Sequence, residues 1–175
     1  MNKKLSIIIP TFQEEKSIKE TLIYLHNFLD NQKVNFEIIV VDDNSNDKTQ
    51  IVVNKIIESY GNIRFYLNKS KKGFGNSIVK GIECSSGRYV SIMMADRSDS
   101  EKDLMTYYNF LNSNPNYDCV FGDRWKENNT KNYPIVKRFI NRIGNRIISK
   151  LFRVNYSDFT NSFKMYKRDL LIEIS

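Results

Sequence analysis

The chain has 175 residues, of which 41% are hydrophobic, and this composition excludes a disordered or fibrous protein. No apolar run approaches the roughly 20 residues that a membrane-spanning helix needs, and the apolar run after the N-terminus is too short for a signal peptide. The formal charge of +7 favours anionic partners, namely nucleic acid, an acidic lipid surface or phosphorylated substrates, without choosing among them. The length suits a single domain over 1–175. Cys84 and Cys119 have no disulfide-framework or zinc spacing, so we expect a reducing cytoplasm.

Short apolar runs alternate with segments of helical periodicity along most of the chain. The apolar runs predict buried strands at 5–9, 36–41, 63–67, 89–94 and 117–121. Helical spacing predicts helices that begin near Ser17, Ile51, Gly75, Leu104 and Ile135, and Ser17 and Glu20 have the spacing of a capping box. This alternation is typical of an α/β fold with a mostly parallel sheet and right-handed crossovers.

Polar clusters follow each predicted strand. They come after Ile9, Val41, Leu67, Met94 and Phe121. In sheets of this kind, ligands bind beyond the carboxyl ends of the strands. We therefore expect all five strand ends to meet at one edge and to bind a polar ligand there.

The first cluster is Pro10-Thr11-Phe12-Gln13-Glu14. Pro10 is expected to end the strand, Phe12 could stack on a flat base, and Glu14 could accept a hydrogen bond from a base or ribose. The alternative is a strand-to-helix turn whose acidic side chain serves only the start of a helix.

The second cluster begins with Asp42 and Asp43. A carboxylate at a strand end can accept from the imide N–H of a uracil or from the N–H groups of a guanine. Helix capping is the alternative, although two adjacent carboxylates exceed what capping requires.

Lys71 and Gly73 stand in a glycine-bearing loop before the third predicted helix. Glycine permits close approach of the backbone to a ligand, and lysine can neutralise phosphate. The Gly-Lys-Ser/Thr ending of a Walker loop is absent, so an ordinary surface turn remains the alternative.

Asp96 and Asp99 follow the fourth predicted strand. Carboxylates directly after a buried strand are costly unless they bind something, and hard cations such as Mg²⁺ or Mn²⁺ prefer oxygen ligands. The pair could hold such an ion against a diphosphate, or it could cap a helix and form a solvated acidic turn.

The segment 135–152 has apolar residues at helical spacing and cations four residues apart at Arg138, Arg142, Arg146 and Lys150. An amphipathic basic helix suits an anionic lipid surface or a phosphorylated acceptor, and a core helix with a solvated basic face is the alternative. The segment 158–163 after it could place Asp158 near an acceptor, or it could be a turn.

Taken in order, these motifs resemble family-2 glycosyltransferases, especially the polyprenyl-phosphate branch that includes dolichol-phosphate mannose synthases. The resemblance runs from Leu5 to about Leu171 and includes five segments. They are 8–14 (opening strand and base-binding turn), 40–45 (acidic nucleotide motif), 70–75 (Gly-Lys-x-Gly-Leu-Gly), 118–125 (Asp-Val-Val-x-Gly-Ser-Arg-Tyr) and 158–163 (Asp-x-Thr-Ser-Gly-Phe).

The resemblance implies a Rossmann-like, GT-A-type fold and inverting transfer of a sugar from a UDP- or GDP-sugar to a polyprenyl phosphate or a glycan. By the match, Asp43 is the base contact, with Asp42 supporting it. Asp96 and Asp99 would hold Mg²⁺ or Mn²⁺ in place of the usual Asp-x-Asp. Arg124 falls on a phosphate-contacting arginine, and Arg138, Arg142 and Asn145 match the basic helix that follows.

The same match suggests an enzyme at the inner face of a membrane, with peripheral membrane contact and a membrane-protein partner. A phosphate acceptor needs no strong base, whereas a sugar hydroxyl would need one, and Asp158 is then the first candidate. Relatives continue past the point where this chain stops, so the C-terminal end of the domain is expected to be incomplete. The rival functions are a non-enzymatic nucleotide- or RNA-binding module and an inactive glycosyltransferase homologue. No RNA-binding aromatic sheet motif is found, so a nucleic-acid partner is not expected.

Overall fold

The computed structural model describes residues 5–69, 72–122, 135–154, 156 and 158–174, with the side chains of 135–139 left out of the description. The chain forms two compact units, one of 1–120 together with 163–175 and the other of 121–162. A single catalytic domain over 1–175 stays a prediction.

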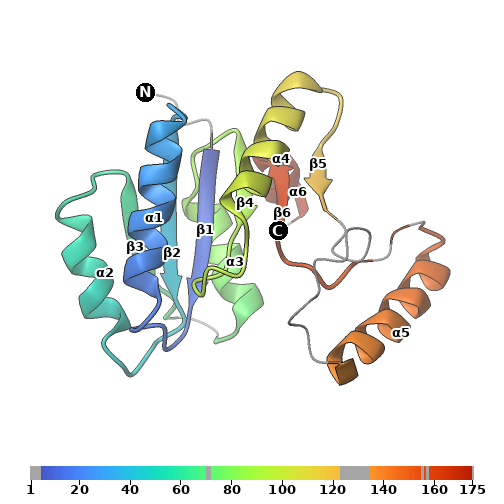
Figure 1. Cartoon of the computed structure of the whole chain (residues 1–175), viewed down its shortest axis with the longest axis horizontal. Coiled ribbons are helices and arrows are strands. Elements are labelled where there is room, and N and C mark those ends of the chain that lie inside the picture. The colour runs from blue at the N-terminus through green and yellow to red at the C-terminus, as the bar shows by residue number, and fades with distance from the viewer. Residues whose placement is uncertain (1–4, 70–71, 123–134, 155, 157, 175) are drawn as a thin grey trace. The chain divides into compact units, whose positions relative to one another are not determined.

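A mostly parallel sheet forms the centre of the larger unit (Figure 1). Its order is β3-β2-β1-β4-β6-β5, in which β3, β2, β1 and β4 are parallel to one another and β6 is antiparallel to β4. The strands are β1 (Leu5–Thr11), β2 (Phe36–Asp42), β3 (Ile63–Leu67), β4 (Tyr89–Ile92), β5 (Cys119–Phe121) and β6 (Lys164–Lys167). The predicted α/β fold is confirmed.

Helices cover both faces of this sheet. The covering helices are α1 (Ile18–Asn31), α2 (Thr49–Ile57), α3 (Phe74–Cys84), α4 (Glu101–Ser113) and α6 (Arg168–Ile174). A further helix, α5 (Ile135–Phe152), belongs to the smaller unit. Buried side chains of α1, α2 and α4 pack with Ile7 and Ile38 on one face, and those of α3 and α6 pack with Ile8 and Ile39 on the other. Because both faces are covered, β1 and β2 are buried along their whole length, which explains their almost unbroken apolar sequences.

The expected end of the first strand at Pro10 is wrong by one residue. β1 continues to Thr11, and Pro10 lies in register with Val41 of β2. Pairing between β1 and β4 stops at Ile8, whose carbonyl accepts from Met93 N over 2.9 Å. Pro10 lies two residues further on the same side of the strand, beyond the end of β4, so its missing N–H removes no ladder hydrogen bond.

One other local expectation is also wrong. The side chain of Ser17 makes no capping hydrogen bond to α1, and its hydroxyl donates to Glu14 Oε2 over 2.5 Å instead. In the sheet, β6 lies between β4 and β5. Convergence of strand ends on one edge is therefore established for β1 to β4 and not for β5.

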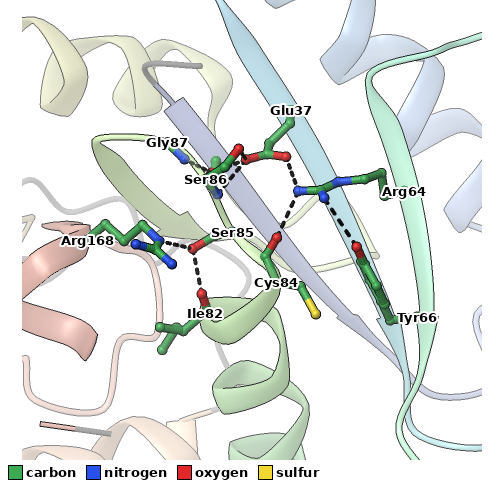
Figure 2. Close-up of polar contacts among 10 residues, drawn as sticks. Glu37, Arg64, Tyr66, Ile82, Cys84, Ser85, Ser86, Gly87 and Arg168 are labelled. Atoms are coloured by element: carbon green, nitrogen blue, oxygen red, sulfur yellow. Dashed lines mark hydrogen bonds and ion pairs between the residues drawn. The ribbon is translucent and has the colours of Figure 1, made fainter. Parts of the chain in front are cut away.

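A buried carboxylate ties together the amino ends of the strands (Figure 2). Glu37 has no exposed side-chain surface, and its Oε1 accepts from Ser6 Oγ at 2.7 Å, Ser86 Oγ at 2.7 Å and Ser86 N at 2.8 Å. Its Oε2 pairs with the guanidinium of Arg64, which also donates to the Cys84 carbonyl over 2.8 Å. Next to Ser86, a Cβ added to Gly87 would lie 2.7 Å from Ser6 N, so glycine is needed for this close approach.

The Glu37 cluster predicts a loss of stability in acid. Burial alone would raise the pKa of Glu37, but hydrogen bonds from Ser86 and Ser6 and the charge of Arg64 outweigh it and hold the pKa below its ordinary value of 4.5. The contribution of Glu37 to the free energy of unfolding is therefore complete above that value and is lost as the pH falls through the lower, folded-state pKa.

Replacing Glu37 with glutamine is expected to lower the free energy of unfolding by about 2 kcal/mol at neutral pH and to flatten its dependence on acid pH. Urea unfolding of wild type, Glu37→Gln and the exposed control Glu58→Gln across this pH range measures the effect. Parallel pH profiles for the wild type and Glu37→Gln would contradict the assignment.

Candidate functional site

Three predicted clusters lie along one edge of the sheet. β2 and β4 flank β1, both are parallel to it, and all three strands begin in register at Leu5, Phe36 and Tyr89. Asp43 and the segment 94–99 therefore leave neighbouring strands at the same edge as the turn that follows β1. We call this the carboxyl edge.

The turn after β1 is fastened to the turn after β2. Gln13 has a positive φ of 59°, and its backbone N–H donates to Ser45 Oγ over 2.8 Å while its side-chain amide donates to Asn46 Oδ1 over 2.7 Å. Sequence reasoning did not single out Gln13, because nothing in its neighbours signals a partner in a distant turn. The two turns form one connected surface.

Phe12 and Glu14 flank Gln13 and differ in their surroundings. The Phe12 ring is 52% exposed, so it is available to stack on a planar ligand. The Glu14 N–H donates to Thr49 Oγ1 over 2.8 Å, and its carboxylate accepts from Ser17. Glu14 thus helps to start α1, as the alternative interpretation expects, and one of its two carboxylate oxygens is already engaged there.

Asp42 is an internal residue of the carboxyl edge. It is 1% exposed, its Oδ1 accepts from Thr11 Oγ1 at 3.2 Å and Ser45 Oγ at 2.5 Å, and its Oδ2 accepts from Ser45 N at 2.9 Å. These contacts fit a residue that shapes the turn rather than one that meets a ligand.

Asp43 is less buried and connects three segments of chain. Its Oδ1 accepts from Asn68 Nδ2 at 2.9 Å, and its Oδ2 accepts from Gly73 N at 2.8 Å. Each carboxylate oxygen has two lone pairs, so the group retains acceptor capacity for a ligand. Gly73 precedes α3 with a φ of 129°, which favours glycine, and its N–H thereby reaches Asp43.

Asn68 is a residue of this cluster that sequence reasoning missed. It is 4% exposed, its N–H donates to the Asp42 carbonyl over 2.8 Å, and its side chain holds the carboxylate of Asp43. Its position directly after β3 was the available signal, since a polar residue there falls at the carboxyl edge.

Residues 94–99, which we call the carboxylate loop, follow β4. Asp99 Oδ2 accepts from Met94 N at 2.8 Å, and Asp96 Oδ1 accepts from Ser98 N at 3.0 Å. Asp96 is exposed and Asp99 is half-buried. Each carboxylate therefore stabilises the loop by accepting a hydrogen bond from its backbone.

Within the described part of the chain, no three histidine, cysteine or acidic side chains gather closely enough to form a metal centre. Asp96 and Asp99 are oxygen donors of the type that Mg²⁺ and Mn²⁺ prefer, so the pair fits such an ion if a ligand and water supply the other positions.

Most of the remaining predicted residues belong to the smaller unit. Arg142 is exposed on α5, whereas Asp158 has no exposed surface. Asn145 is 2% exposed, and its Oδ1 accepts from Phe159 N at 3.0 Å, which ties the segment after α5 to that helix. Lys71 and Arg124 lie outside the described residues, as does the side chain of Arg138.

The α5 helix confirms the predicted amphipathic segment. Its described apolar side chains are exposed, at 62% for Ile140, 60% for Ile147 and 73% for Leu151. The cations Arg142, Arg146 and Lys150 are exposed too. Within the described residues, no helix is both long and apolar enough to cross a bilayer.

A groove of about 490 Å³ lies along the outer side of α1. Its walls include Tyr24, Phe28 and Arg97. Arg97 belongs to the segment that follows β4, and a second hollow of about 300 Å³ is lined in part by Asn68, so both hollows border residues of the carboxyl edge.

The architecture is that of a GT-A-type glycosyltransferase. A mannosyltransferase from Pyrobaculum calidifontis, solved with GDP-Man and Mn²⁺, superposes with a TM-score of 0.66 over 100% of this chain and 47% of its own, at 18% identity. Glucosyl-3-phosphoglycerate synthase from Mycobacterium tuberculosis, solved with Mn²⁺, UDP and phosphoglyceric acid, superposes with a TM-score of 0.68 over 97% of this chain and 57% of its own, at 16% identity.

Residues 6–175 match Glycosyl transferase family 2, and the chain belongs to that family. It is 34% identical over 110 residues to a dolichyl-phosphate beta-glucosyltransferase of Dictyostelium discoideum, covering 59% of this chain and 34% of the relative. It is 26% identical over 140 residues to a dolichol-phosphate mannosyltransferase of Pyrococcus furiosus, covering 79% of this chain and 38% of the relative. The chain thus spans little more than a third of these curated relatives.

Proposed function

We propose that the chain is the catalytic part of an inverting glycosyltransferase that moves a sugar from a UDP- or GDP-sugar to a polyprenyl phosphate. The observation that carries this proposal is the arrival of Asp43 and the carboxylate loop at the same edge of the sheet from strands on either side of β1. Family membership and the names of the two relatives support it.

The nucleoside would lie over the turns after β1 and β2. The exposed Phe12 ring would stack on the base, and the unused lone pairs of Asp43 would accept its N–H groups. Pro10 fixes the backbone that leads into this turn, Glu14 would accept from the base or ribose, and Asp42 shapes the turn from beneath. Lys71 and Gly73 are proposed to face the phosphates.

Asp96 and Asp99 would hold the Mg²⁺ or Mn²⁺ ion, as their oxygen donor set allows. When bound, the ion would offset the negative charge that develops on the leaving diphosphate. The Mn²⁺ named with two solved neighbours supports this assignment. The chain's own task is to keep both carboxylates at the carboxyl edge, which the hydrogen bonds from Met94 N and Ser98 N help to do.

Transfer to a polyprenyl phosphate needs no strong base, because the attacking phosphate oxygen is already anionic. That oxygen would form a bond to the anomeric carbon while the bond from this carbon to the diphosphate breaks and the diphosphate leaves with the electron pair. Arg124, Arg138 and Arg142 would attract the acceptor phosphate. For a glycan hydroxyl as acceptor, Asp158 would be the base, although its burial counts against direct access.

A polyprenyl phosphate lies in a membrane, so we place the protein at the inner membrane face, with a membrane protein as a further partner. The exposed apolar and basic side chains of α5 support peripheral contact with an anionic lipid surface.

Incubation of the chain with radiolabelled UDP- and GDP-sugars, Mn²⁺ and polyprenyl phosphate tests the proposal. We expect label in the lipid phase from one donor class and none when EDTA replaces the metal. Label that enters a glycan instead would reassign the acceptor. Saturable nucleotide binding without any transfer would identify an inactive homologue.

A further inference from the structure

Two side chains of α1 contact the carboxylate loop. Thr21 Oγ1 donates to the Ala95 carbonyl over 2.6 Å, and both residues are buried. Three residues along the same helix, the ring of Tyr24 lies under the guanidinium of Arg97, with 4.3 Å between the Arg97 Cζ and the ring centroid. Residues three apart share a helix face, so the two contacts form one attachment.

Arg97 needs such a contact because its backbone is in a conformation that side chains other than glycine rarely adopt. Its φ is 61°, in the left-handed region, directly after Asp96. A cation over an aromatic face is attractive, and stacking on Tyr24 can therefore offset the strain of that conformation. In the described part of the chain, Arg97 forms no ion pair with Asp96 or Asp99, so its charge is held at α1.

We propose that Tyr24 is a positioning residue for metal binding, which acts through Arg97 on the two carboxylates that flank it. The inference rests on the proposed function, since it concerns the loop assigned to the metal. Tyr24 holds Arg97 over the outer face of α1, which keeps Asp96 and Asp99 directed to the carboxyl edge and keeps a cation away from them. Loss of the ring would leave the loop in a broader set of conformations with Arg97 able to approach the carboxylates.

The test measures Mn²⁺ binding in the presence of UDP or GDP, and the electron paramagnetic resonance signal of free Mn²⁺ reports how much of the ion is bound. Tyr24→Leu is expected to weaken Mn²⁺ binding about tenfold, as loss of an outer-shell partner commonly does. Tyr24→Phe keeps the aromatic face and is expected to bind Mn²⁺ as the wild type does. Tyr117→Leu makes the same tyrosine-to-leucine change at an exposed side chain whose ring contacts Phe110, and it serves as the matched control.

The Arg97→Gly variant distinguishes the effect of backbone strain at Arg97 from the effect of its stacking on Tyr24. Glycine relieves the strain of the positive φ but removes the guanidinium, so melting temperature should be kept while Mn²⁺ affinity falls if stacking positions the loop. Nucleotide affinity measured without metal should be unchanged in every variant.

Wild-type Mn²⁺ affinity in a folded Tyr24→Leu variant would overturn the inference and leave the proposed function intact. A loss in Tyr24→Phe equal to that in Tyr24→Leu would also overturn it, because the hydroxyl and not the ring face would then matter. Absence of nucleotide-dependent Mn²⁺ binding in the wild type would instead remove the proposed metal site and this inference together.

Discussion

Asp96→Asn is expected to lower the rate of sugar transfer by roughly 100-fold or more at a fixed Mn²⁺ concentration. The substitution keeps the size of the side chain, and the amide oxygen can still accept from Ser98 N, so the loop should keep its conformation. What is lost is one negative charge on an exposed side chain at the carboxyl edge. The fall should therefore appear in the metal-dependent rate and not in the melting temperature.

The control for Asp96→Asn is Asp30→Asn, which makes the same change at an exposed position near the end of α1. Initial rates across a Mn²⁺ titration distinguish weaker metal binding, which excess metal restores, from a lower maximal rate. Full metal-dependent activity of Asp96→Asn would remove Asp96 from the metal site.

Asp43→Asn is expected to weaken nucleotide binding roughly 10- to 150-fold, the range for a hydrogen bond to a charged group. Asp43 accepts from both Asn68 and Gly73, and an asparagine there would turn its NH₂ group toward one of these two donors. The variant thus loses an acceptor for the base and loosens the loop that begins at Gly73. Calorimetric titration with UDP and GDP measures the change.

Asp47→Asn is the control for Asp43→Asn, because Asp47 belongs to the same polar turn and accepts from the backbone of Glu15 and Thr49. We expect it to lower thermal stability without changing nucleotide affinity. Equal losses of affinity in the two variants would show that the turn as a whole, and not the Asp43 carboxylate, determines binding.

Most strands and helices of the larger unit could be predicted from the sequence. Strands of a sheet that is covered on both faces need nearly unbroken apolar sequences. The runs 5–9 and 36–41 became β1 and β2 within a residue or two, and the periodic segment with Leu22 and Leu25 became α1. Asp43 and Asp96 could be placed at one edge from the sequence, since parallel strands direct their carboxyl ends the same way.

Antiparallel pairing of β6 with β4 could not be predicted in the same way. The segment 164–167 is short and contains two lysines, and its pairing places Met165 opposite Ser91, far away along the chain. A strand of this kind is specified by its partner and by burial of Met165, and its own sequence resembles a loop.

Hydrogen bonds between segments far apart in the sequence could not be predicted either. Gln13 with Ser45, Asn68 with Asp43, and Thr21 with Ala95 each depend on a fold that brings distant polar side chains together. Local patterns report which residues can form hydrogen bonds but not which distant groups they meet, so the partners of these supporting residues emerge from the structure alone.

We propose that the carboxyl edge binds a nucleoside diphosphate together with a divalent ion. Titration of the wild-type chain with UDP and with GDP, each with Mn²⁺ and again with EDTA, measures this binding. We predict saturable binding of one of the two nucleotides that strengthens when Mn²⁺ is present and weakens in Asp96→Asn. Failure of both nucleotides to bind, or binding of equal affinity in EDTA, would contradict the claim.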